Sequence, residues 1–162
     1  MNVPQVEAQI TAIDTNLTKT QKLLAKARRT EAKAKTANER AALELTQVEQ
    51  ELGQLQQELI YEFTEADEWD SSAKDPRTGE RTQDWGDMVL ERLLRSDPRF
   101  ADALGKLYQS QGTAIDAKGI AMEAQAATAN LYDKLSIQRA NASLVSSLLR
   151  FAATTADDGD ES

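Results

Sequence analysis

A heptad repeat in the first third of the chain constrains its fold more than any other sequence feature. Sixteen positions follow alternating spacings of four and three residues without a skip. They are Val6, Ile10, Ile13, Leu17, Thr20, Leu24, Ala27, Glu31, Ala34, Asn38, Ala41, Leu45, Val48, Leu52, Leu55 and Leu59. An apolar stripe of this period stays on one side of a helix only when helices wrap around each other in a left-handed supercoil. The repeat therefore predicts a long coiled-coil helix over residues 1–63.

A second long helix is predicted over residues 98–153. It begins after Ser96 and Asp97, whose side chains can cap a helix, and Pro98 suits a first helical turn. Small and large residues alternate along it at heptad spacing, and we interpret this line as its packing face. The line comprises Ala101, Gly105, Tyr108, Gly112, Ile115, Gly119, Met122, Ala126 and Ala129.

Three of the glycines in this line are one heptad apart. Because glycine inside a helix costs about 1 kcal/mol relative to alanine, their regular spacing indicates close approach of another backbone. We therefore predict helix-packing or oligomer contacts for Gly105, Tyr108, Gly112, Ile115, Gly119 and Met122.

The apolar residues of the second helix change phase after Ala129, which predicts a local adjustment of the supercoil. From there they are Leu131, Leu135, Ala142, Val145, Leu149 and Ala152. A further apolar line lies on a neighbouring face at Leu104, Leu107, Ala114, Ala121, Thr128 and Leu135. A single hairpin partner cannot cover both faces, so we predict that hairpins associate into a multi-helix bundle. One broad packing face is the alternative.

The two helices are predicted to pair antiparallel, with facing residues whose numbers sum to about 163. This register sets the alanine-rich centres of the two helices against each other and brings Arg29 or Lys33 near Asp133. The fold class is therefore all-α: a long antiparallel two-helix coiled-coil hairpin with a small tip of loop and short helix. A domain-swapped dimer satisfies the same pairings.

The tip is predicted over residues 64–97. The segment 75–79 has a turn signature, with Pro76 at its second position and Gly79 able to take a positive φ. A reversal centred on Arg77 brings Trp69 and Trp85 opposite each other. The apolar residues between positions 88 and 94 predict a short amphipathic helix, and residues 154–162 are predicted to form a disordered acidic tail.

Six of the eight aromatic residues fall between positions 61 and 108. They could form a small core that closes the tip, or a site for a partner, because Trp and Tyr often anchor interfaces and loops often hold binding residues. The candidate partner-binding residues of the tip are Tyr61, Phe63, Trp69 and Trp85.

Charge is segregated along the first helix. Residues 19–40 carry eight basic and two acidic residues, whereas residues 41–73 carry nine acidic residues and no basic one. A basic stripe can bind a phosphate backbone, but pairing with acidic groups of the same or another subunit is the favoured interpretation. The residues that could make electrostatic or phosphate contacts share one stripe and are Lys22, Lys26, Arg29, Lys33 and Arg40.

The residue inventory argues against most enzyme classes. The chain has neither Cys nor His, so it lacks thiolate nucleophiles and the commonest general base and metal ligand. The tip carboxylates have no EF-hand spacing, and no metal or cofactor is expected. No apolar run is long enough to span a bilayer and residues 1–10 lack a signal-peptide pattern, so a cytoplasmic location is expected.

The sequence thus predicts a non-enzymatic, oligomeric coiled-coil protein. It would serve as a structural, adaptor or assembly protein whose partners are itself and another protein. The alternative function is nucleic-acid binding or nuclease inhibition through the basic stripe of the first helix.

Overall fold

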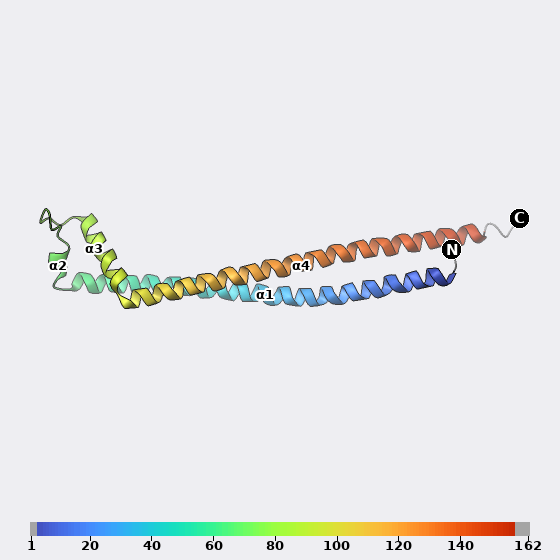
Figure 1. The fold of residues 1–162 in the computed structure, drawn as a ribbon, viewed down its shortest axis with the longest axis horizontal. Helices are drawn as coiled ribbons and strands as arrows, with labels where there is room; N and C mark the ends of the chain where they lie inside the picture. The colour runs from blue at the N-terminus through green and yellow to red at the C-terminus, as the bar shows by residue number, and fades with distance from the viewer. Residues whose placement is uncertain (1–2, 158–162) are drawn as a thin grey trace. The chain divides into compact units, whose positions relative to one another are not determined.

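A computed structural model describes residues 3–157 of the chain, and the side chains of residues 5–152 (Figure 1). This part of the chain contains helices and no β-strand, with one isolated bridge between Lys74 and Arg81. The predicted all-α hairpin, in which a long first helix packs against a long last helix, is confirmed. The helices are α1 (Val3–Glu65), α2 (Trp69–Ser72), α3 (Gln83–Ser96) and α4 (Pro98–Asp157).

The helix boundaries differ from the predicted ones by a few residues. Helix α1 ends two residues beyond position 63, and α3 begins five residues before Met88. Helix α4 begins at Pro98 as predicted but continues to Asp157, so the first four residues of the predicted acidic tail are helical. The rest of that tail, residues 158–162, lies outside the described residues.

The chain divides into two compact units. The first unit contains residues 1–36 and 119–162, and the second contains residues 37–118. Within each unit a stretch of α1 lies antiparallel beside a stretch of α4 (Figure 1). In the first unit Arg28 lies over the ring of Tyr132, and in the second Arg99 pairs with Glu62. These contacts join residues whose numbers sum to 160 and 161, so each unit lies within three residues of the predicted register.

The packing face of α1 is the predicted heptad line. Between residues 5 and 59, every buried or half-buried residue belongs to that line, and only Ile10 of the line is exposed in this stretch. Leu59 is fully buried, and Leu24, Ala34 and Ala41 are nearly so. The prediction for the first helix is therefore confirmed residue by residue.

The packing face of α4 is a different line from the predicted one. Apart from Leu104 and Gln111, its buried and half-buried residues follow spacings of three and four without a break, and we call this line the inner seam. The inner seam comprises Phe100, Ala103, Leu107, Ser110, Ala114, Ala117, Ala121, Ala124, Thr128, Leu131, Leu135, Gln138, Ala142, Val145 and Leu149. The predicted change of phase after Ala129 is therefore wrong, because one register serves the whole helix.

The predicted packing line of α4 is wrong as a hairpin face, since each of its nine residues is exposed. Tyr108, Ile115 and Met122 are 66%, 71% and 62% exposed. The inner seam contains Ala, Ser, Thr and Gln where the outward line contains Tyr, Ile and Met. Small side chains in the seam suit a partner helix that is itself alanine-rich at Ala27, Ala34 and Ala41.

The fully buried Leu59 provides a test of this packing. Leu59→Ala leaves a cavity between the helices and is expected to lower the free energy of unfolding by about 2–4 kcal/mol. Leu43→Ala is the matched control, because Leu43 lies on the same helix and is 73% exposed. Urea denaturation followed by circular dichroism measures both variants, and equal losses would contradict the assigned seam.

Candidate interaction surfaces

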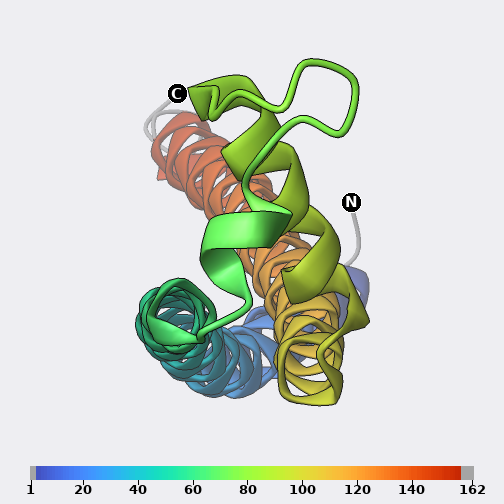
Figure 2. The same cartoon turned by 90° about the vertical axis from the view of Figure 1, so that its left-hand side faces the viewer.

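The chain reverses direction at the tip in a tight loop between α2 and α3 (Figure 2). The carboxylate of Asp75 accepts a hydrogen bond from the backbone N–H of Arg77 at 2.9 Å, and the Asp75 carbonyl accepts one from Gly79 at 2.8 Å. Gly79 has a φ of +70°, a conformation that residues with a Cβ adopt at a cost. The antiparallel bridge between Lys74 and Arg81 shows that the chain reverses direction midway between them, next to Arg77. The predicted turn is therefore confirmed.

Two contacts fix the start of α3 to the tip. The Thr82 side chain caps α3 by accepting a hydrogen bond from the Trp85 backbone N–H at 3.3 Å. The indole Nε1–H of Trp85 donates to the carbonyl of Ser72 at 3.0 Å, which ties α3 to the end of α2. Trp85 is half-buried and has this polar partner, so it contributes to closing the tip.

The other tip aromatics lie in different surroundings. Trp69 is half-buried and lines a shallow groove together with Ala73, Gly86 and Leu90. Phe63 is also half-buried near the end of α1, whereas Tyr61 is 67% exposed. Trp69 and Trp85 thus belong to the structure of the tip, and partner binding by any of the four aromatic residues stays a prediction.

A cluster of charges fixes the start of α4 to α1 in the second unit. The guanidinium of Arg99 lies 2.8 Å from a carboxylate oxygen of Glu62 and 3.0 Å from one of Asp97. Hydrogen bonds from Arg99 hold the pKa of each carboxyl below its ordinary value, and the two carboxylates raise the pKa of Arg99. This cluster was not predicted from the sequence, because the predicted register differs by two residues from the observed pairing of Glu62 with Arg99.

The carboxyls of Glu62 and Asp97 make stability depend on pH. Their pKa values are lowered from 4.5 and 3.8, so their stabilisation is present above those values and is lost as pH falls through the lower folded-state values. We expect Arg99→Ala to flatten the decline in unfolding free energy between about pH 5 and pH 2. Arg92→Ala is the charge-matched control, and urea titrations that show the same flattening for it would contradict the assignment.

A line of apolar and small residues covers the side of α4 that is turned away from α1, and we call it the outer stripe. An added Cβ at Gly105, Gly112 or Gly119 would meet no atom within 4 Å, so no other segment of residues 3–157 approaches these glycines closely. Their predicted role as helix-packing residues is therefore absent within the hairpin, while a role in contacts between copies stays a prediction. The outer stripe comprises Gly105, Tyr108, Gly112, Ile115, Gly119, Met122, Ala126 and Ala129.

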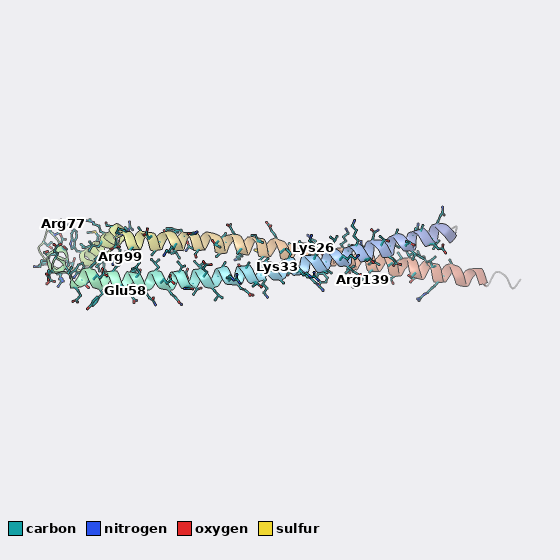
Figure 3. All side chains as sticks on the ribbon, turned by 90° about the horizontal axis from the view of Figure 1, so that it is seen from below. Lys26, Lys33, Glu58, Arg77, Arg99 and Arg139 are labelled. Atoms are coloured by element: carbon teal, nitrogen blue, oxygen red, sulfur yellow. The ribbon has the colours of Figure 1, made fainter. Side chains whose placement is uncertain are left out.

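The basic residues of α1 in the first unit are exposed, and Lys26 and Lys33 project from the helix (Figure 3). The predicted register brings Arg29 or Lys33 near Asp133, but neither forms an ion pair with it within the described residues. Pairing of the basic residues with acidic groups of another subunit stays a prediction. Arg28 instead stacks on Tyr132, with 4.8 Å from its guanidinium carbon to the ring centroid.

The two units have opposite charge. The first unit, residues 1–36 and 119–162, contains ten basic and nine acidic residues, a net charge of +1, and four of those acidic residues fall at positions 157–161. The second unit, residues 37–118, contains nine basic and eighteen acidic residues, a net charge of −9. The five ion pairs found among the described side chains all lie in the second unit. Arg40, the last residue of the predicted basic stripe, belongs to that second unit and is exposed.

Neither a metal site nor a membrane span is found in residues 3–157. No group of three or more carboxylates lies close enough there to hold a metal ion, and no helix is both long and apolar enough to cross a bilayer. Comparisons with protein-family models, curated proteins and solved structures gave no match.

Proposed function

We propose that the chain is a non-enzymatic, oligomeric coiled-coil protein that acts as a structural, adaptor or assembly component. The observation that carries this proposal is the outer stripe of α4. Helices of monomeric proteins normally bury one apolar face and present a polar face to water. Helix α4 has apolar residues at heptad spacing on two faces, and α1 covers only one of them. Contiguous apolar surface of this kind is typical of protein–protein interfaces.

The tip supports contact with a second kind of partner. Tyr61 is exposed beside the half-buried Phe63, and Trp69 borders a groove whose rim carries the Arg81–Asp70 ion pair. Aromatic and arginine side chains are enriched where proteins bind one another. We therefore propose that the tip contacts another protein while the outer stripe serves self-association.

Light scattering coupled to size exclusion tests the self-association. The expected mass is at least twice the 17.8 kDa of one chain at about 0.05 M salt, because the outer stripe is then covered. A smaller mass is expected at about 0.5 M salt if contacts between the oppositely charged units contribute. A mass of one chain at every protein and salt concentration would contradict the proposal.

Nucleic-acid binding is a second candidate function, and it is favoured because none of the ion pairs among the described side chains involves the basic stripe. Side chains without an acidic partner in the chain are available to phosphate groups. Binding through Lys22, Lys26, Arg29 and Lys33 is expected to weaken roughly a hundredfold between about 50 and 200 mM salt, since each phosphate contact releases counterions.

Gel shifts with duplex DNA and RNA across that salt range measure this binding. Replacing the four stripe residues by Gln is expected to abolish the shift. Replacing Lys74, Arg92, Lys106 and Lys118 by Gln removes the same charge from the second unit and is the matched control. No shift of the unmodified chain at about 50 mM salt excludes the candidate.

A further inference from the structure

We propose that the outer stripe docks a second copy of this chain in antiparallel orientation, with the second unit of one copy on the first unit of the other. The proposal rests on the proposed function and deepens it, because it names the surface, the partner and the direction of self-association. It is argued from the alternation of residue size along the stripe and from the charges of the two units.

Residue size alternates regularly along the outer stripe. One set of positions has the smallest side chains, at Gly105, Gly112, Gly119 and Ala126. Three residues after each of these comes a member of a second set, formed by Tyr108, Ile115, Met122 and Ala129. Three members of the second set are large, and all three are more than 60% exposed in the single chain.

Antiparallel pairing sets each position of the first set against one of the second set. The four resulting layers join residues whose numbers sum to 234, and each large side chain faces a Gly or an Ala. The layers are Gly105 with the partner's Ala129, Tyr108 with the partner's Ala126, Gly112 with the partner's Met122, and Ile115 with the partner's Gly119.

Parallel pairing in register fits the stripe poorly. It would set Gly112 against the partner's Gly112, which leaves a void, and Tyr108 against the partner's Tyr108, which crowds the next layer. The size pattern is thus self-complementary in the antiparallel direction and not in the parallel one.

Charge favours the same direction. In every antiparallel layer one residue belongs to the second unit of one copy and the other belongs to the first unit of its partner. The docked units carry net charges of −9 and +1, whereas parallel pairing brings the two units of charge −9 together. Much of this charge is on α1, which lies on the opposite side of α4 from the outer stripe. The charges of the two copies therefore attract each other over a long distance, and this attraction is strongest at low salt, where the Debye length is long.

The antiparallel arrangement has two electrostatic costs. Asp116 lies close to the partner's Asp116 across the two-fold axis, and Lys118 lies close to the partner's Lys118. Parallel pairing would instead place Lys118 near the partner's Glu123. Exposed charge pairs of either kind contribute little to association, whereas an unfilled layer loses the burial of a whole Ile or Met side chain. Packing therefore decides the direction.

Single-cysteine variants test the direction directly, because the chain has no cysteine of its own. Gly105→Cys and Ala129→Cys place thiols in the same layer, within the roughly 6 Å between Cα atoms that a disulfide spans. Mixed in equal amounts and oxidised in air with copper phenanthroline, the two variants are expected to form a disulfide-linked heterodimer. Each variant alone is expected to give little product, because equivalent residues then lie roughly 36 Å apart.

A mixture of Lys106→Cys with Ala129→Cys is the matched control, since Lys106 points away from the stripe. Equal yields for the two mixtures, or efficient cross-linking of Gly105→Cys with itself, would overturn the proposal. If no heterodimer forms although light scattering gives the mass of two chains, this proposal fails and the proposed function stands. If light scattering gives the mass of one chain throughout, both fail.

Ile115→Glu provides a second measurement. It puts a charge into the middle of the stripe, at a residue that is 71% exposed in the single chain, so the hairpin is expected to keep its helical circular dichroism. The dissociation constant of the dimer is expected to rise at least tenfold. Leu43→Glu, at the exposed Leu43 of α1, is expected to leave it unchanged, and equal effects of the two variants would overturn the proposal.

Discussion

The packing of α1 against the inner seam of α4 is the interaction on which the rest of this structure depends. Two helices that each contribute a single narrow line of residues bury little surface, so the line has to be continuous and closely packed. Alanines at the centre of both lines let the helices approach closely, while Leu24, Leu59 and Leu135 provide much of the buried apolar surface. The buried Thr20 and Thr128 interrupt this apolar seam in the first unit.

A hairpin of two helices leaves most of each helix in contact with water. On α1 the remaining surface is largely charged, as expected for a helix with one partner. On α4 the surface opposite the seam contains Tyr108, Ile115 and Met122. In a helix with one partner, charged or polar residues would be expected at these positions. The difference between the two helices is the physical reason for assigning a contact between copies to α4.

The sequence predicted α1 and the tip turn well because both depend on local chemistry. In α1 only one line of residues has a period of 3.5, and in the turn Asp75 and Gly79 have few other conformations available. The inner seam of α4 was predicted in part, as the neighbouring line through Leu107 and Leu135 and as the residues after Ala129. It was not predicted as the hairpin face before Ala129, because α4 has two lines with the same period and the outer one contains Tyr, Ile and Met there. A signal was present: the inner seam runs without a break from Phe100 to Leu149, whereas the predicted line needed a change of phase after Ala129. Ion pairs of the basic stripe within one chain could not be predicted from the register, since side-chain directions around a helix decide them and the height along it does not.

Helix α4 has one face covered within the hairpin, and we propose that a second copy covers the opposite face. The most direct test is a cysteine scan of residues 110–122 in which the rate of thiol labelling by a maleimide is measured in dilute and in concentrated protein. In dilute protein the account predicts slow labelling at the inner-seam positions 110, 114, 117 and 121, and fast labelling at 112, 115, 119 and 122. In concentrated protein the second set is predicted to become slow as well, at the same heptad spacing. Labelling that is slow at 112, 115 and 119 in dilute protein, or that stays fast there at high concentration, would contradict the account.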